Sequence, residues 1–335
     1  MGHISKLHLF AKGTDAPDVI KGFKYQELKT LEIWLYNKVH GIEEHIYCDF
    51  EDDIFQRDLK SFKSTFKQLK LYSSKNFSFS SDEITKTLAH FFMLFVKGEY
   101  LMDDPLFIFE TNTSVAAKRG DNDAELLEEW ASNQDDISSQ LLDKCAVKLK
   151  TIIDSYIKEQ FEKLETEEDN AELLIAKEVY DKLPDEVWES FAKSIRWVFD
   201  GISSDQAIEV SIENSFELIR QLPFPIAKDD YSLVFDRLRG VVGDKSMQSE
   251  PHNRLLTNSL LDSQLLSLGS KDDKVYMNSY ELWKDVKDIP IFNIGEFYQV
   301  LFAAKHCRRN SYLGDQSELW LNLLTIYQNH ADILR

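Results

Sequence analysis

The sequence has few cysteines, and the three that it has lie far apart. Cys48, Cys145 and Cys307 show no paired spacing. Zinc knuckles and disulfide frameworks both depend on cysteines at short, regular intervals. The spacing therefore excludes a recognisable zinc knuckle and a disulfide framework. We expect three reduced thiols, as in a cytosolic protein.

Long apolar runs are also missing. No segment approaches the roughly 18 consecutive apolar residues that indicate a membrane-spanning helix. The start, MGHISKLHLFAKG, lacks the apolar core of a signal peptide, and its sixth residue, Lys6, does not suit myristoylation. We therefore expect a cytoplasmic protein without a membrane partner.

Two further sequence signatures are missing. The segment GVVGDKS has the Gly-x-x-Gly and Lys-Ser pieces of a phosphate-binding loop but lacks the Walker spacing, so it predicts no ATPase. No fixed repeat of 20–50 residues is present, which argues against a solenoid.

The balance of charge is strongly acidic, with a formal net charge of −19. Phosphate affinity comes from Lys and Arg, so this balance argues at first against a nucleic-acid binder. Residues 1–80, however, contain 12 basic and 11 acidic residues, a net charge of +1. The remainder carries a net charge of −20. The acidity thus lies almost entirely after residue 80.

A short basic strip interrupts the first part of the chain. Between residues 55 and 75 there are six basic residues and one acid, Asp58. The basic residues are Arg57, Lys60, Lys63, Lys67, Lys70 and Lys75. On charge alone, the strip is equally consistent with a solvated face and with a surface that binds phosphate.

Hydrophobic periodicity predicts alternating helices and strands in the first 120 residues. Apolar residues at helical spacing predict helices over 18–40, after Gly22, and over 80–98. Alternation predicts strands over 45–55 and 65–73, and an almost continuously apolar run predicts a buried strand over 105–114. The expected fold is therefore an α/β core, a small mixed sheet flanked by helices.

After about residue 121 the pattern becomes helical. Helices are predicted over 122–131, 138–165, 171–183, 188–199, 204–222, 231–246, 252–268, 294–306 and 317–334. We expect two domains, a nuclease-like core over 1–120 and a mostly α-helical interaction or regulatory region over 121–335. The looser stretch 268–293 is a possible subdivision of the second region.

The two predicted strands of the first region carry side chains suited to metal chemistry. Asp52 and Asp53 end the first strand, while Gln68 and Lys70 share one face of the second because side chains alternate. Carboxylate and amide oxygens suit Mg²⁺. A lysine beside them can orient or deprotonate a water, or stabilise charge that develops on a phosphate.

An acid on one strand followed by (D/E/Q)-x-K on the next resembles the PD-(D/E)XK nuclease superfamily. Four segments in order strengthen this resemblance: GFKYQ, FEDDI, FKQLK and FIFETN. Together they are similar to the double-stranded DNA endonuclease domain of CD-NTase-associated anti-phage effectors, a domain also related to those of Lamassu-type (ABC-three-component) and Avs systems. The resemblance covers about residues 18–262 and is strongest over 20–115.

The resemblance implies a role for each matching residue. Asp53 and Gln68 are expected to bind Mg²⁺ or Mn²⁺, and Lys70 to act in catalysis. Gln26 is expected to support the site from the first helix, while Asp52 and Glu51 remain alternatives to Asp53, because a slip of one residue exchanges the faces of a strand. Gln68 departs from the commoner Asp or Glu, as is typical of the subgroup.

The resemblance also implies partners. The substrate is expected to be double-stranded DNA, with phosphate contacts from Arg57, Lys60, Lys63, Lys67 and Lys75. The chain is expected to be held inactive in a complex with a protein such as an SMC-like sensor ATPase, and to be activated as a homo-oligomer. The alternative is a catalytically idle scaffold subunit whose acidic helical region docks on such a sensor.

Overall fold

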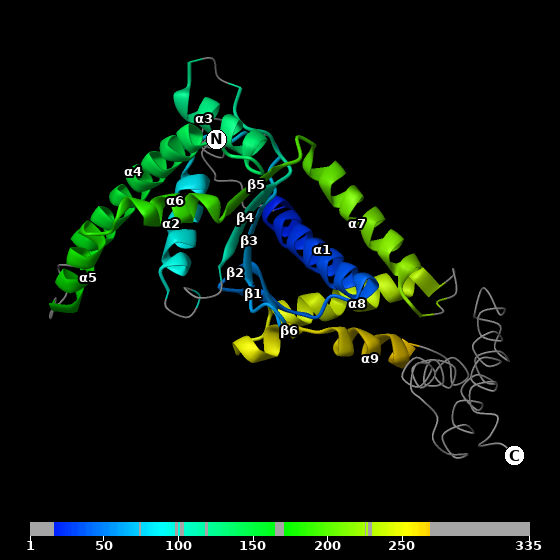
Figure 1. Cartoon of the computed structure of the whole chain (residues 1–335). Helices are drawn as coiled ribbons and strands as arrows, with labels where there is room; N and C mark the ends of the chain where they lie inside the picture. The colour runs from blue at the N-terminus through cyan, green and yellow to red at the C-terminus, as the bar shows by residue number, and fades with distance from the viewer. Residues whose placement is uncertain are drawn as a thin grey trace, which may run out of the picture.

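Figure 1 shows a computed structural model of the chain. It describes residues 17–268, apart from 74, 98–99, 101–103, 118–119, 165–170, 225 and 227–229. The elements are α1 Pro17–His40, β1 Glu44–Phe50, β2 Asp52–Asp58, β3 Ser64–Lys70, α2 Asp82–Phe95, β4 Leu106–Thr111, α3 Asn122–Asn133, α4 Ser139–Leu164, α5 Ala171–Asp181, α6 Asp185–Lys193, β5 Ile195–Phe199, α7 Ser204–Gln221, α8 Tyr231–Ser246, the 3₁₀ helix η3 Pro251–Arg254, β6 Leu255–Leu256 and α9 Asn258–Leu268. The helices predicted after residue 290 lie outside the described residues.

A six-stranded mixed sheet lies at the centre of the described residues. Its strand order is β5-β4-β3-β2-β1-β6. The pairs β6–β1, β1–β2 and β2–β3 are antiparallel, while β3–β4 and β4–β5 are parallel. The predicted α/β class, with a mixed sheet flanked by helices, is therefore confirmed.

Helices cover both faces of this sheet (Figure 1). α1, α7, α8 and α9 pack on one face around an aliphatic core that includes Leu28, Leu31 and Leu238. α2, α3, α4 and α6 pack on the other face around an aromatic core that includes Phe66 and Phe107. The sheet is buried on both sides, as a sheet with parallel strands requires.

Helix α1 begins earlier than its pattern predicted, at Pro17 instead of after Gly22. Proline suits the first turn of a helix because its missing N–H would have no intrahelical partner there. Leu28, Leu31 and Leu35 recur at helical spacing and are buried against the sheet and α8. This packing fixes Gln26 and Lys29, which lie on the same helix, relative to the strands.

The acidic segment forms two strands instead of the single predicted strand over 45–55. The chain reverses between β1 and β2, with Asp49 and Glu51 at φ values of 51° and 62°. The pairs Cys48–Ile54 and Phe50–Asp52 keep even-numbered residues opposite one another. Because side chains continue to alternate between the two faces through the reversal, the sequence pattern predicted one strand in place of two.

Two strands of the sheet come from the region predicted to be helical. The predicted helix over 188–199 is instead α6 followed by β5. Trp188, Phe191 and Ile195 keep helical spacing and are all buried in the same core, so periodicity did not reveal the change. Likewise, the predicted helix over 252–268 is η3, the two-residue strand β6 and α9.

These strands change the picture of the second region, although its long helix α4 matches the prediction over 138–165. β5 extends the sheet beyond β4 at one edge, and β6 extends it beyond β1 at the other. Residues after 120 therefore complete the sheet as well as covering it with helices. Within the described part of the chain, no helix has both the length and the apolar character needed to cross a bilayer.

Candidate functional site

The candidate site lies where β2 and β3 separate. Their pairing runs from Arg57 opposite Ser64 to Ile54 opposite Lys67 and is not continued toward Asp53. β3 stays paired with β4 on its other side as far as Lys70, which lies opposite Thr111. The last residues of β3 are thus held by one neighbour only, and Asp52 and Asp53 lie at the opening.

Asp53 and Gln68 are brought together at this opening. The Asp53 carboxylate accepts a hydrogen bond from the Gln68 side-chain amide, and the same oxygen, Oδ2, accepts the Leu69 backbone N–H at 2.7 Å. The Asp53 side chain therefore accepts a β3 backbone N–H just beyond the last paired residues of β2 and β3. The predicted contact partners do meet, but through the nitrogen of Gln68 and not its oxygen.

Asp52 is the more exceptional of the two acids. It is 9% exposed, its Oδ1 accepts the Asp53 N–H at 2.8 Å, and its buried Oδ2 has no hydrogen-bond partner. Burial, together with the neighbouring Asp53 charge, raises the pKa of Asp52 to about 7, although the Asp53 N–H and the Lys70 charge oppose the rise. A buried carboxylate oxygen without a partner is costly and uncommon in folded proteins.

Glu51, the third acid, has a structural role in this arrangement. Its Oε1 accepts a hydrogen bond from Lys97 at 2.6 Å and from the Tyr100 hydroxyl at 3.3 Å. These contacts join the β1–β2 reversal to the segment after α2 and hold Glu51 in its left-handed conformation. The Glu51 carboxylate is thereby engaged with Lys97 and Tyr100, and its role as an alternative to Asp53 stays a prediction.

Lys70 and Gln26 line one pocket beside the opening. The pocket has a volume of about 360 Å³ and is formed by the first turns of α1 and the end of β3. The Lys70 ammonium makes no hydrogen bond or ion pair with any described residue. Gln26, predicted from the sequence as a supporting residue, is thus placed within the same pocket as the predicted catalytic lysine.

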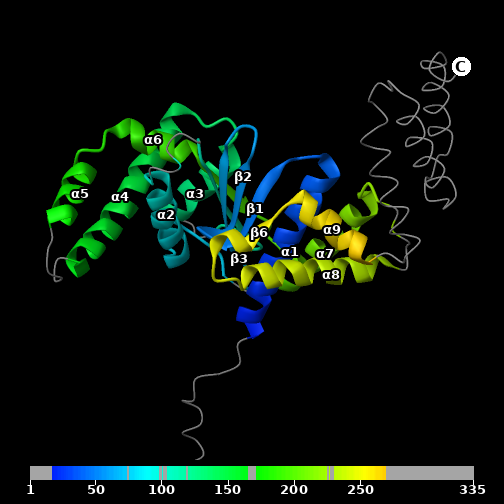
Figure 2. The ribbon, with the colours of Figure 1, turned by 90° about the horizontal axis from the view of Figure 1, so that it is seen from below.

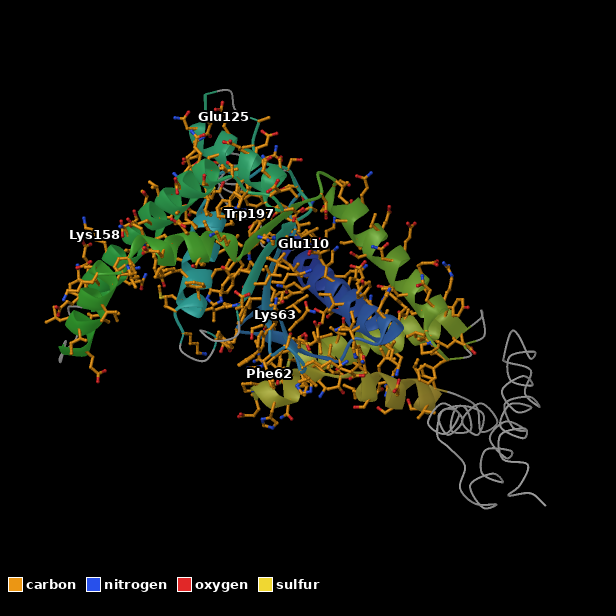
Figure 3. All side chains as sticks on the ribbon, in the orientation of Figure 1. Phe62, Lys63, Glu110, Glu125, Lys158 and Trp197 are labelled. Carbon is orange, nitrogen blue, oxygen red and sulfur yellow. The ribbon has the colours of Figure 1, made fainter. Side chains whose placement is uncertain are left out.

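A second buried charge cluster was not predicted. Glu110 on β4 is 5% exposed, and its two oxygens lie 2.8 Å from Lys29 Nζ and 2.9 Å from Lys67 Nζ. Burial by itself raises the pKa of Glu110, but Lys67 and Lys29 outweigh it, so that the pKa is lowered. Figure 3 shows Glu110 where the sheet meets α1. An acid inside the apolar run FIFETN was the available signal in the sequence.

The basic strip does not form one surface. Lys67 pairs with Glu110, and Lys75 pairs with Glu83 at 2.5 Å. Lys60 and Lys63 are exposed in the β2–β3 turn, roughly 20 Å from the opening at about 3.3 Å per residue of strand. Figure 3 places Lys63 at the opposite end of the sheet from Glu110. DNA contact by these residues stays a prediction, and the structure disperses them.

The donor set at the opening fits an incomplete Mg²⁺ site. Asp52 Oδ2 is a buried oxygen without a partner, which a cation would satisfy. Among the described residues, no three His, Cys, Asp or Glu side chains are grouped to hold a metal. Mg²⁺ commonly takes one or two protein carboxylates and completes its shell with water and substrate phosphate. The residues therefore fit a site that substrate completes.

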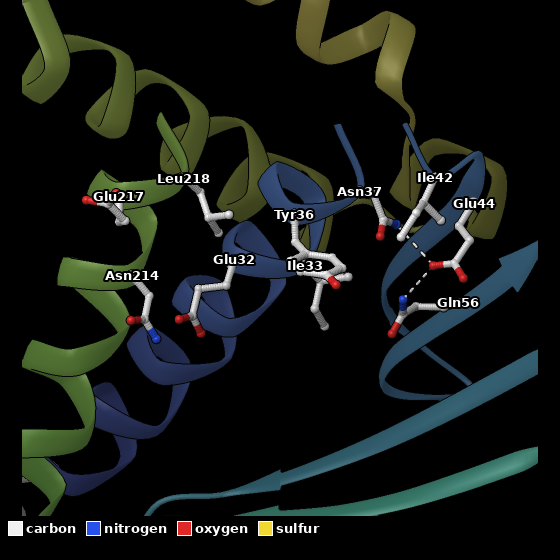
Figure 4. Close-up of a pocket in the computed structure, with 10 residues that line it drawn as sticks. All are labelled: Glu32, Ile33, Tyr36, Asn37, Ile42, Glu44, Gln56, Asn214, Glu217 and Leu218. Carbon is white, nitrogen blue, oxygen red and sulfur yellow. Dashed lines mark hydrogen bonds between the residues drawn. The ribbon is translucent and has the colours of Figure 1, made fainter. Parts of the chain in front are cut away.

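A larger cavity lies elsewhere, between α1, α7 and the start of the sheet. It has a volume of about 550 Å³ and is lined by three glutamates, among them Glu44. Figure 4 shows Asn37 and Gln56 donating hydrogen bonds to the Glu44 carboxylate at 3.0 and 2.8 Å. The lining residues include no Lys or Arg that could bind a phosphate, so this cavity is not part of the candidate site.

Comparisons with known proteins give only weak similarities. No family model matches the chain, and no curated protein matches it. An Acinetobacter baumannii "Cap4 SAVED/CARF-domain containing receptor with the cyclic trinucleotide 3'3'3'-cAAA" is 13% identical, with a TM-score of 0.42 over 76% of this chain and 46% of that structure. A Moraxella osloensis Cap4 receptor is 10% identical, with a TM-score of 0.40 over 87% and 61%.

The chain thus spans about half to three fifths of the length of these receptors. At such identities and TM-scores, the similarities establish neither a shared family nor a shared function. The assignment of function therefore depends on the site.

Proposed function

We propose that the chain is a Mg²⁺-dependent endonuclease that cuts double-stranded DNA as an effector of anti-phage defence. The observation that carries the proposal is the opening between β2 and β3. It combines a buried carboxylate oxygen without a partner, a carboxylate–amide pair and a lysine that pairs with no described residue. Such groups match the acid and Q-x-K of the nuclease resemblance.

Each residue has a distinct task in this proposal. Asp52 and Asp53 would hold Mg²⁺, which lowers the pKa of a bound water and offsets charge on the phosphate. The Gln68 amide would turn over to present its oxygen when Asp53 no longer needs its N–H. Lys70 is positioned to bind the phosphate or orient the attacking water, since its charge acts on Asp52 but it forms no hydrogen bond or ion pair with a described residue.

Cleavage of plasmid DNA tests the proposal. We expect purified full-length protein with Mg²⁺ to cut supercoiled plasmid, and Lys70→Ala to cut at least about 100-fold more slowly, as expected for loss of a charge that acts in the transition state. Lys158→Ala is the matched control, because Lys158 is an exposed lysine on α4, far from the opening (Figure 3). Equal cutting by Lys70→Ala and the wild type would refute the site assignment.

Binding of a sensor protein is a second candidate function, with a separate observation behind it. Helix α5 exposes Leu174, Ile175 and Val179, each more than half accessible, on a strongly acidic part of the chain. Exposed apolar groups of this kind mark surfaces that bind other proteins. Co-purification with the product of the neighbouring gene tests it, and replacing these three residues with serine should abolish the complex while leaving plasmid cutting unchanged.

A further inference from the structure

The pocket beside Lys70 has features that the cutting reaction alone does not require. Residues Leu69 to Ser73 form one side of its wall, and five residues of α1 form the other: Asp18, Val19, Gly22, Phe23 and Gln26. Figure 2 shows the first turns of α1, in dark blue, projecting from the body of the protein. The volume of about 360 Å³ lies within the range of pockets that hold small ligands, roughly 300–1,000 Å³.

An aromatic side chain stands at the wall of this pocket. Phe23 is 63% exposed although it lies on a helix that buries an apolar stripe elsewhere. Tyr72, also at the wall, is held in place by Glu83 through its hydroxyl and by an edge contact with Phe77. An exposed aromatic ring in the same pocket as Lys70 combines a stacking surface for a base with a cation for a phosphate.

A glycine keeps the pocket open. Gly22 lies inside α1, where glycine weakens a helix relative to other residues. A Cβ added at Gly22 would meet no atom within 4 Å, so packing does not require the absence of a side chain. Gly22 nevertheless lines the pocket, and an added Cβ there would face open space.

We infer that this pocket binds one nucleotide of a DNA strand, with its base turned out of the duplex and stacked on Phe23, and its phosphate beside Lys70. The inference rests on the proposed nuclease function and extends it by naming a subsite. Gln26 offers an amide that can hydrogen-bond the base or sugar. The occupant is a nucleotide and not a purely apolar group, because the pocket joins an aromatic ring to Lys70. Asp18, the acid in its wall, accepts a hydrogen bond from the Ser73 hydroxyl at 3.3 Å.

The subsite is tested by the binding of a 5′-phosphorylated deoxytetranucleotide to full-length protein without metal, followed by saturation-transfer NMR. We expect transfer to base protons in the wild type and its loss in Gly22→Leu, whose side chain fills the pocket. Gly240→Leu is the matched control, because Gly240 is also helical and its added Cβ also meets nothing within 4 Å. Leucine favours helix over glycine, so neither variant should unfold.

A second pair of variants tests the stacking itself. Phe23→Ala should weaken tetranucleotide binding roughly 10-fold, within the range of one base–aromatic stack. Ile20→Ala should bind like the wild type, because Ile20 is 69% exposed on the same helix and does not line the pocket.

Equal binding by Gly22→Leu and Gly240→Leu, or no binding by the wild type, would overturn the subsite. Plasmid cutting by the same wild-type preparation separates this inference from the function on which it rests. Cutting without tetranucleotide binding would refute the subsite and leave the nuclease proposal standing. Binding that Gly22→Leu abolishes, in a protein that does not cut, would support the subsite and refute the nuclease proposal.

Discussion

Two buried acids on the same sheet, Glu110 and Asp52, differ in the partners of their carboxylate oxygens. At Glu110, both carboxylate oxygens face a lysine at less than 3 Å. At Asp52, one carboxylate oxygen is buried and has no hydrogen-bond partner. Both acids are at least nine-tenths buried, so burial does not distinguish them. The difference lies in the partners that the fold supplies.

The pKa directions express this difference. The pKa of Glu110 is lowered despite its burial, whereas that of Asp52 is raised to about 7, chiefly because of its burial. The first group therefore stabilises the fold as a charged unit, while the second makes the ionised state costly. Strongly shifted pKa values are common at functional sites, so Asp52 is the acid at which the proposed function is best tested.

The largest expected effect comes from Asp52→Asn, which removes the costly charge but keeps the shape. Because the folded pKa of Asp52 is above its unfolded value, the stability that its protonated form contributes is lost as pH rises from about 4 to about 7. A shift of about 3 pKa units corresponds to about 4 kcal/mol. In EDTA, Asp52→Asn should therefore be more stable than the wild type at pH 8 by up to that amount, and similar at pH 4.

Urea unfolding at the two pH values measures this difference, and plasmid cutting should fall at least about 100-fold, since a metal ligand is lost. Asp143→Asn, at an exposed position on α4, is the control and should change neither property. A variant that is less stable than the wild type at pH 8 would show that Asp52 has an unrecognised partner.

How far the sequence predicts this comparison depends on the residue. Asp53, Gln68 and Lys70 were predicted from a resemblance carried by four segments in order, since an acid followed by Q-x-K is weak evidence alone. The unpartnered oxygen of Asp52 was not, because it depends on a reversal at Glu51 that leaves the alternation of side chains unbroken. The Glu110 cluster joins Lys29 on α1, Lys67 on β3 and Glu110 on β4, and no local pattern connects residues so far apart.

The strands of the sheet were also only partly predictable from local sequence. Helices such as α1 and α4 follow from apolar spacing alone, since each buries one stripe. β5 and β6 are short, and whether a short apolar segment becomes a strand depends on the strand beside it. β5 forms because β4 offers it an open parallel edge, which is a property of the assembled sheet.

The next largest effect is expected at Glu110, whose two carboxylate oxygens both pair with lysines. Glu110→Gln removes the ion-pair partner of Lys67 and leaves Lys29 with Glu32 alone, at 3.5 Å, which should lower the free energy of unfolding by about 3 kcal/mol. Thermal and urea unfolding at pH 7 measure this loss. Glu83→Gln, which breaks the more exposed pair with Lys75, should cost at most about 1 kcal/mol. Equal losses in the two variants would contradict the contrast drawn here between buried and exposed pairs.

A smaller effect is expected at Gln68, where substitutions should change both the stability of the protein and the Mg²⁺ concentration that cutting requires. Gln68→Ala removes the hydrogen bond to the Asp53 carboxylate and should cost about 1.5 kcal/mol of stability. Gln68→Glu should instead lower the Mg²⁺ concentration for half-maximal cutting by roughly 10-fold, because a carboxylate is a better ligand than an amide. An unchanged or higher Mg²⁺ requirement in Gln68→Glu would argue against a ligand at this position.

The smallest effect is expected at the turn between β2 and β3, where Lys60 and Lys63 are exposed at the far end of the strands. The double substitution to alanine should change stability by less than about 0.5 kcal/mol, as is usual for exposed residues. It should leave cutting at saturating DNA unchanged, since both lysines lie roughly 20 Å from the opening at about 3.3 Å per residue.

If both lysines touch phosphates, the slope of log affinity against log salt should fall by about 2 in the double variant. DNA binding titrated at several salt concentrations measures that slope. A large loss of cutting at saturating DNA would show that charge far from the opening takes part in the reaction, which would weaken the distinction between Lys70 and the other lysines of the basic strip.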